Sequence, residues 1–226
     1  MGLMEGEQEY PSVLLGGAVE AFGQLPGVGR KTALRYALHL LTQLPEQQRH
    51  FLSQLEAFVT HSGRCPRCNS LSDGGALCSI CQTSSRNAAL LCVVGDYRDI
   101  LALERTQEYH GYYFSLGGLI DPLHGVGPSQ LPLGKLEQRV SEEEVEEVIL
   151  AFAATPEGDT TSYYIARLVG QYGVKVSQLA RGVYLGATLE QIDSPTLGTA
   201  LAERRVLTQA HHVGRAVAAH TNREEL

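Results

Sequence analysis

Between residues 11 and 61, hydrophobic residues recur every three or four positions, which predicts a series of amphipathic helices. A glycine- and proline-rich segment, 23–29, interrupts the pattern, which resumes over 30–44. Pro45 follows, and proline favours the first turn of a helix. The pattern therefore predicts three helices in succession, the third with an apolar stripe of Phe51, Leu52, Leu55, Phe58 and Val59.

A different pattern begins at residue 88, where short apolar runs alternate with helical segments. The first run is continuous, as expected for a strand buried on both faces of a sheet. Helices are expected over 99–109 and 160–172, and Ser141 to Glu144 match a capping box that predicts the start of another. This alternation favours a parallel sheet with right-handed crossovers. The expected strands are 89–94, 112–116, 148–152 and 174–176.

Two segments differ from both patterns. Residues 62–86 are polar, contain four cysteines and are too poor in apolar residues to form a core alone. For residues 183–226 the pattern predicts an arm with two helices, 197–207 and 208–220, that have narrow apolar stripes. We expect this arm to pack on a neighbouring subunit. We therefore expect a mixed α/β chain of four parts: 1–61, 62–86, 87–182 and 183–226.

The cysteines of the second part follow the spacing C-x2-C, nine residues, C-x2-C. Two residues between thiolates let both reach one tetrahedral ion, so the pattern predicts one structural zinc ion per chain. Ordinary buried cysteines or redox pairs are the alternatives. The predicted ligands are Cys65, Cys68, Cys78 and Cys81, whereas Cys92 lies in an apolar run and is expected to be core.

The interruption between the first two helices reads Leu25-Pro26-Gly27-Val28-Gly29 and is followed by Arg30, Lys31 and Arg35. A glycine turn leading into a basic helix start is typical of a helix-hairpin-helix, which binds the DNA backbone without reading sequence. A Walker A loop would need glycine directly before Lys31, where this chain has Arg30. The other alternative is a purely structural turn with solvated basic residues.

Charge and composition limit these interpretations. The 226 residues include 18 Lys and Arg and 25 Asp and Glu, a net charge of −7, so DNA contact requires a local basic patch. With 43% hydrophobic residues the composition is that of a globular protein. No apolar run reaches the roughly 18 residues of a membrane helix. The acidic, polar start is unlike a signal peptide, so we expect a cytoplasmic protein.

Acidic residues follow two of the expected strands. Gly95 and Asp96 come after the first, and Glu157, Gly158 and Asp159 after the third. Loops at the carboxyl ends of parallel strands form ligand sites. Glu157 and Asp159 are therefore an acidic pair that could hold Mg²⁺.

The order and content of these parts resemble the RecR family of bacterial recombination mediators over nearly the whole chain. The resemblance rests on four features: the glycine hairpin, the four cysteines, the loop from Gly117-Gly118-Leu119-Ile120 to Gly125-Val126-Gly127-Pro128, and Glu157-Gly158-Asp159. It implies that the α/β part is a Toprim domain. The departures include Gly95, where Toprim domains usually carry glutamate, and Asp121-Pro122-Leu123-His124, where the family usually has Ser-Pro-Leu-Asp.

The resemblance also implies a function. Members of the family are not known as enzymes; they form tetramers or dimers that clamp DNA. They act with RecO, and in some settings RecF, to help load RecA on single-stranded gaps. By position, Lys31 and Arg35 match the DNA-contacting residues, the four cysteines match the zinc ligands, and Glu157 with Asp159 match a stretch linked to RecO contact.

Two other hypotheses stay open. One is a Toprim-type, metal-dependent phosphoryl-transfer enzyme on DNA, which would need carboxylates around the scissile phosphate. The other is a zinc-bound interaction module without a DNA role. The tyrosines Tyr112, Tyr113, Tyr163 and Tyr164 are expected to be packing residues, and the acidic run 142–147 a solvated helix face or a docking surface for a basic partner.

Overall fold

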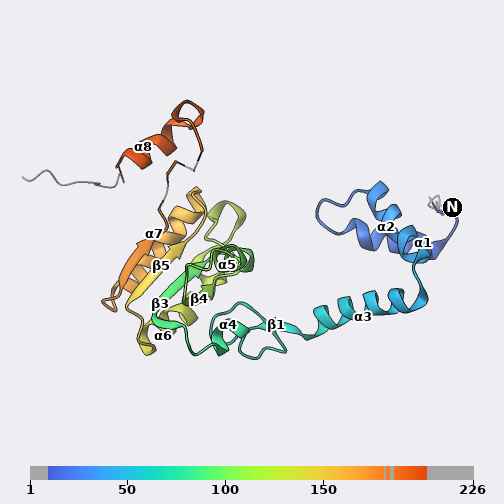
Figure 1. Cartoon of the computed structure of the whole chain (residues 1–226), viewed down its shortest axis with the longest axis horizontal. Helices are drawn as coiled ribbons and strands as arrows, with labels where there is room; N and C mark the ends of the chain where they lie inside the picture. Colours follow the sequence, from blue (N-terminus) through green and yellow to red (C-terminus); the bar gives the residue numbers. More distant parts are fainter. Residues whose placement is uncertain (1–9, 181, 184–185, 203–226) are drawn as a thin grey trace, which may run out of the picture. The chain divides into compact units, whose positions relative to one another are not determined.

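The computed structural model describes residues 10–180, 182–183 and 186–202 (Figure 1). The chain divides into two compact units at the boundary between Arg86 and Asn87. The N-terminal unit contains helices and a cysteine-bearing hairpin, and the C-terminal unit contains a parallel sheet with helices. In these ranges no helix is long and apolar enough to cross a membrane.

The N-terminal unit begins with the three predicted helices: α1 (Val13–Gly23), α2 (Arg30–Thr42) and α3 (Pro45–His61). Ser12 caps α1, because its Oγ accepts a hydrogen bond from the N–H of Leu15 at 3.3 Å. α1 and α2 pack around a small buried cluster of Val19, Ala33 and Ala37. The two alanines let the helix backbones approach closely, so these helices form one compact hairpin.

Helix α3 has a different environment, since none of its residues is buried. It begins at Pro45 as predicted, and the side chain of Gln47 accepts a hydrogen bond from the N–H of Leu44 at 3.2 Å. Gln48 Nε2 donates to the carbonyl oxygen of Leu40 at 2.8 Å and ties α3 to the end of α2. The predicted apolar stripe of α3 therefore lies on the surface of this unit.

The cysteine segment folds as a short antiparallel hairpin followed by one helical turn. Its elements are β1 (Ser62–Arg64), β2 (Leu71–Asp73) and α4 (Ser79–Gln82). Gly74 and Gly75 follow β2 with φ angles of 61° and 72°, in the left-handed region that glycine adopts without steric cost. They turn the chain back, so that the second cysteine pair approaches the first.

The C-terminal unit is built on a four-stranded sheet in the order β4-β3-β5-β6, with all neighbouring strands parallel. The predicted strands and their parallel arrangement are confirmed. Cys92, Val93 and Val94 are buried at the centre, with Tyr113 and Phe114 beside them. The strands are β3 (Asn87–Val94), β4 (Gly111–Ser115), β5 (Glu147–Ala151) and β6 (Lys175–Gln178).

Helices cover both faces of this sheet, with α7 and α5 on opposite sides of the strands in Figure 1. Ile165 and Val169 of α7 and Ile100 of α5 are fully or almost fully buried. The long loop before α6 contains two short 3₁₀ turns, η1 and η2. The bounds are α5 (Tyr97–Glu104), η1 (Pro122–His124), η2 (Pro128–Gln130), α6 (Leu133–Glu142) and α7 (Pro156–Gly170).

The predicted helix start at Ser141 is wrong, because Ser141 lies in the last turn of α6. The apolar face of α6 begins at Leu133, and the N–H of Glu143 closes the helix by donating to the Arg139 carbonyl at 2.9 Å. The acidic run 142–147 is consequently not a helix face. It leaves α6 after Glu142, ion-pairs through Glu143 with the buried Arg139 at 3.1 Å, and enters β5.

Beyond the sheet, the described part of the arm contains η3 (Leu189–Gln191) and α8 (Ser194–Ala202). Helix α8 overlaps the first expected helix, 197–207, but begins earlier. Asp193 explains this start, because its Oδ1 accepts a hydrogen bond from the N–H of Thr196 at 2.9 Å. The second expected helix, 208–220, lies outside the described residues.

Candidate nucleic-acid interface and metal centre

A tight turn joins α1 to α2 and exposes the start of α2. Gly27 adopts a φ of 77°, and the N–H of Val28 donates to the carbonyl of Leu25 at 3.0 Å. Gly29 is the N-cap of α2, and no side chain caps this helix end. The positive end of the helix dipole therefore lies at the surface, where it favours an anion.

The three predicted DNA-binding residues lie together in the first two turns of α2. Arg30, Lys31 and Arg35 are all exposed, and the first turn contains no acidic residue. Lys31 and Arg35 are one turn apart and so share a face of the helix. The guanidinium of Arg35 also lies 5.8 Å from the ring centroid of Tyr36. The turn thus carries a small basic surface on an otherwise acidic chain.

The four predicted metal ligands converge within the cysteine hairpin. Their sulfur atoms all lie within 4.8 Å of one another, and the Sγ atoms of Cys68 and Cys78 are 3.5 Å apart. Four sulfurs bound tetrahedrally at ~2.3 Å from one ion would be about 3.8 Å apart. The donor set and its spacing therefore fit a closed, four-coordinate metal site.

The backbone around the first cysteine favours its thiolate form. Burial by itself raises the pKa of Cys65, but hydrogen bonds from the backbone N–H groups of Cys78, Cys68 and Arg67 lower it to about 7. Burial raises the pKa of Cys78 to about 11 when no ion is present. Asn69 adopts a φ of 57° at the end of the turn between the first two cysteines, where its N–H donates to the carbonyl of Cys65 at 2.9 Å.

The acidic residues of the C-terminal unit lie at the carboxyl ends of β3 and β5. These strands are neighbours, and their following helices lie on opposite faces, as at the usual ligand crevice of such a sheet. Asp96 caps α5 through a 2.8 Å hydrogen bond from the N–H of Arg98, while Asp99 accepts one from the N–H of Asp96 at 2.9 Å. Both carboxylates therefore serve the start of α5.

Glu157 and Asp159 occupy the first turn of α7, half-buried and exposed respectively. Gly158 between them touches the preceding loop, since a Cβ there would lie 2.1 Å from the carbonyl oxygen of Ala153. Within the described ranges, the four cysteines are the only group of three or more metal-ligating side chains that gather closely. The acidic pair is thus held by a tight turn and has no third carboxylate beside it in those ranges.

Thr161 connects this helix to the long loop before α6. Its Oγ1 accepts a hydrogen bond from the buried N–H of Ile120 at 2.9 Å and donates to the carbonyl of Glu157 at 2.7 Å. Nearby, Asp121 caps η1, and the adjacent His124 side chain holds the pKa of Asp121 below its ordinary value. Sequence reasoning missed Thr161, because a threonine inside a helix carries no signal of a distant loop.

Two family models match the chain in the regions just described. A model of the RecR helix-hairpin-helix matches residues 16–59, and a Toprim domain model matches residues 89–180. Recombination protein RecR of Porphyromonas gingivalis is 46% identical over 197 residues, which cover 87% of this chain and 95% of the relative. The chain belongs to the RecR family.

Other relatives extend this match. Recombination protein RecR of Bacteroides thetaiotaomicron is 46% identical over 201 residues, 89% of this chain and 98% of the relative. The RecR protein of Synechococcus sp. strain RCC307 is 48% identical over 189 residues, 84% and 87% of the respective chains. The resemblance noted in the sequence is therefore confirmed, and with it the helix-hairpin-helix and Toprim parts of the fold.

At the position where Toprim domains usually have glutamate, this RecR family member has no carboxylate and closely packed neighbours. A Cβ on Gly95 would lie 3.3 Å from Leu119 Cδ2 and 3.6 Å from Asp99 Oδ2. A side chain here would therefore meet the flexible end of Leu119 and the carboxylate of Asp99. Asp96, which follows, is engaged at the start of α5 and also pairs with Arg98 at 3.0 Å.

The tyrosine prediction is confirmed for one pair and wrong for the other. Tyr112 and Tyr113 are buried in β4, and Tyr113 donates from its hydroxyl to Glu104 at 2.7 Å. Tyr163 and Tyr164, by contrast, are 68% and 39% exposed. They lie on the outer side of α7, because Ile165 and Val169 occupy the side that covers the sheet.

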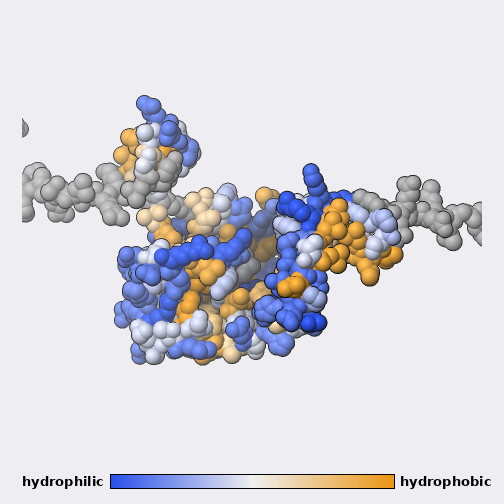
Figure 2. Space-filling view, turned by 45° about the vertical axis from the view of Figure 1, so that its right-hand side comes forward, coloured by the Kyte–Doolittle hydropathy of each residue, from blue (hydrophilic) through white to orange (hydrophobic). Residues whose placement is uncertain are grey.

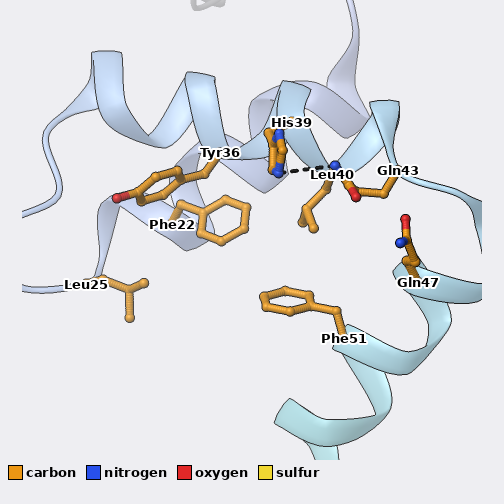
Figure 3. Close-up of a pocket in the computed structure, with 8 residues that line it drawn as sticks. All are labelled: Phe22, Leu25, Tyr36, His39, Leu40, Gln43, Gln47 and Phe51. Carbon is orange, nitrogen blue, oxygen red and sulfur yellow. Dashed lines mark hydrogen bonds between the residues drawn. The ribbon is translucent and has the colours of Figure 1, made fainter.

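The helical region matched by the RecR model also exposes a broad apolar surface, seen in orange on the helical N-terminal unit in Figure 2. A pocket of about 500 Å³ opens between α1, α2 and α3. Figure 3 shows Phe22, Tyr36 and Phe51 directed into it from the three helices. Beyond the pocket, the exposed apolar stripe of α3 continues this surface with Leu52, Leu55, Phe58 and Val59.

Proposed function

We propose that this chain is a non-catalytic DNA-binding clamp of recombinational repair. In this proposal it acts with RecO, and in some settings RecF, to help load RecA on gapped or single-stranded DNA in the cytoplasm. The observation that carries the proposal is the exposed basic turn of the helix-hairpin-helix, with Arg30, Lys31 and Arg35 beside an uncapped helix start. The names of the relatives, recombination protein RecR, support the process.

The binding would be independent of sequence. Helix starts and basic side chains contact phosphate oxygens, which are the same at every base pair. One hairpin brings few cations, and the whole chain has a net charge of −7. Several hairpins acting in one assembly would bind more strongly, because each further contact becomes intramolecular.

The apolar surface of the N-terminal unit supports such an assembly. Val59 is 77% and Phe58 58% exposed on one side of α3, and water does not favour a continuous apolar stripe of this kind. A second copy of this chain would cover it, and we propose a dimer or tetramer. The arm, 183–226, is the other candidate contact between copies.

The test is a titration of gapped duplex DNA at increasing salt, with the solution mass measured in parallel. We expect replacement of Lys31 and Arg35 by alanine to weaken binding at least tenfold and to flatten the salt slope, because fewer counterions are released. A matched control replaces Arg49 and Lys135, two exposed basic residues that are not part of the hairpin. Equal affinities of the two double variants would contradict the assigned DNA site.

We also propose that the four cysteines hold one structural zinc ion per chain. Four thiolates fill a tetrahedral shell and leave no position for substrate, so the ion would stabilise the hairpin rather than catalyse. The closeness of the four sulfurs supports this assignment. Metal analysis of the purified protein tests the identity of the ion, and a tetrathiolate site holding iron would contradict it.

Two observations support a role without catalysis. Gly95 supplies no carboxylate, and Asp96 and Asp99 are both used at the start of α5. Metal-dependent phosphoryl transfer needs carboxylates free to hold ions around the phosphate. Incubation of labelled DNA with the chain and Mg²⁺ provides the test, since specific cleavage or religation would favour the enzyme hypothesis.

We finally propose that Glu157 and Asp159 contact a basic surface of RecO. Their place in the first turn of α7 and their partial or full exposure support a contact with a partner. Replacing Glu157 by alanine is expected to weaken the complex with RecO more than DNA binding. A normal complex would count against this role.

A further inference from the structure

The outer face of α7 carries more than the two acidic residues. Tyr163 and Tyr164 follow them and are exposed, although the tyrosines of β4 in the same unit are buried. The guanidinium of Arg167 lies 6.0 Å from the ring centroid of Tyr163. Exposed tyrosine and arginine together are the residue types that dominate protein interfaces.

Helical spacing places these side chains in two rows on the half of α7 that faces away from the sheet. Asp159, Tyr163 and Arg167 are successively four residues apart and form one row along α7. Glu157 and Tyr164 are seven residues apart, two helical turns, and form a neighbouring row. Glu157 and Asp159 are two residues apart and point to different sides of the helix, so the two carboxylates lie at the two edges of this exposed half, with the two rings one to two turns further along.

A groove borders the second row. It has a volume of about 540 Å³ and lies between Tyr164 and Leu168 of α7 and the segment from Pro128 to Gly134. Its far wall is held in place by Glu137, whose Oε1 accepts hydrogen bonds from Gln171 Nε2 at 2.9 Å and Tyr172 Oη at 3.0 Å. An apolar side chain would find Tyr164, Leu168 and Leu131 there.

The charges around this surface favour a protein over nucleic acid. Three carboxylates, of Glu157, Asp159 and Glu137, border it, against the one guanidinium of Arg167. Phosphates would meet mainly repulsion, whereas lysine or arginine side chains of a partner would meet complementary charge. The aromatic part would bury an apolar side chain of the same partner.

We propose that the outer face of α7 is a single docking surface for a basic partner protein, in which Tyr163, Tyr164 and the adjacent groove take an apolar side chain while Glu157 and Asp159 take flanking cations. The inference rests on the proposed function, which assigns the two carboxylates alone to a partner. It adds the aromatic residues that would supply most of the binding energy.

The experiment measures the affinity of the full-length chain for purified RecO and, separately, for gapped DNA. We expect Tyr163→Ala to weaken the RecO complex about tenfold or more and to leave DNA affinity within about twofold, because a buried interface tyrosine is a typical hot spot. Leu101→Ala is the matched control: Leu101 is 41% exposed on α5 and should leave both affinities unchanged. Thermal unfolding of each variant checks that the fold is retained.

The salt dependence of binding distinguishes the contribution of the carboxylates from that of the tyrosines. The loss caused by Glu157→Gln should shrink at about 0.5 M salt, since exposed charges are screened, while the loss caused by Tyr163→Ala should persist. Loss of RecO affinity in Glu157→Gln but not in Tyr163→Ala would overturn this inference and leave the proposed function standing. Loss of DNA affinity alone in Tyr163→Ala would make the face a nucleic-acid contact and overturn it too. Failure of the wild-type chain to bind RecO would overturn the partner role itself.

Discussion

The two units of this protein use their apolar residues in opposite ways. In the C-terminal unit, Phe114, Val148 and Ile165 are enclosed between the sheet and its helices. In the helical part of the N-terminal unit, the buried residues are Val19, Ala33 and Ala37, while the larger side chains of α3 face outward. The sheet and its helices enclose their large apolar residues, whereas the helical part has more apolar surface than its own helices cover.

The difference follows from how many apolar faces each unit can cover with its own helices and strands. A parallel sheet is covered on both faces by the helices that its crossovers require, so apolar runs in the sequence find partners within the same chain. In the N-terminal unit α1 and α2 bury only a small cluster against each other, and the stripe of α3 stays exposed beyond the pocket that Phe51 lines. This difference agrees with the proposal that the first unit contacts other molecules, DNA at the hairpin and a second copy at α3.

The largest effect is expected at the cysteine cluster, where the proposed zinc ion would take the place of a hydrophobic core. Cys68→Ser should remove the bound ion, since structural zinc contributes about 10–16 kcal/mol in small zinc domains. We expect hydrogen-exchange protection to fall in residues 62–82 and to persist in the sheet. Metal content per chain is the direct measurement.

Cys92→Ala is the matched control for this change, because it removes a thiol that is buried in β3 and lies outside the cluster. It should retain about one ion per chain. A Cys68→Ser protein that keeps its full metal content would rule out the cluster as the site.

The self-contained core should show the next largest effect. Phe114→Ala is expected to lower the free energy of unfolding of the sheet domain by about 3–5 kcal/mol, the usual cost of a large cavity. Phe114 is 1% exposed, so little relaxation can fill the space. Urea unfolding monitored by circular dichroism measures the change, and a loss below about 1 kcal/mol would show that this core is not closely packed.

The same kind of substitution on α3 should act on assembly instead of folding. Phe58→Ala is expected to lower the average solution mass at a fixed concentration while leaving the helix content unchanged, because Phe58 is exposed within its own unit. Analytical ultracentrifugation measures the mass. Leu123→Ala, at an exposed position in η1, is the control, and an unchanged mass distribution in both variants would remove α3 from the contact between copies.

The sequence predicted well wherever one pattern determined the structure. The three helices, the parallel strands and the cysteine cluster followed from periodicity and spacing, because these local signals coincide with the packing that the fold requires. The family resemblance added the assignment of the hairpin and Toprim parts.

The sequence predicted the structure poorly where contacts between residues far apart in the sequence determine it. Ser141 to Glu144 read as a helix start, yet α6 begins at Leu133, because Leu136, Arg139 and Val140 are needed against the sheet. Tyr163 and Tyr164 read as core, yet Ile165 and Val169 hold that side of α7. In both cases the local pattern was compatible with two arrangements, and tertiary packing selected the other one.

The smallest effect is expected from a polar contact between β5 and β6, at the edge of the sheet. Ser177 donates to Glu147 Oε1 at 2.6 Å and Lys175 lies 3.0 Å from Oε2, and these contacts hold the pKa of Glu147 below its ordinary value of 4.5. A carboxyl whose pKa is lower in the folded state stabilises the fold above its unfolded pKa, and this stabilisation disappears as the pH falls through the folded pKa.

Wild type should therefore be more stable than Glu147→Gln above about pH 5, with the difference shrinking to zero below the folded pKa. Urea unfolding across pH 3 to 7 measures it, with Glu144→Gln, at an exposed position between α6 and β5, expected to change little. A difference between wild type and Glu147→Gln that does not depend on pH would mean that the charge of Glu147 contributes nothing to joining β5 and β6.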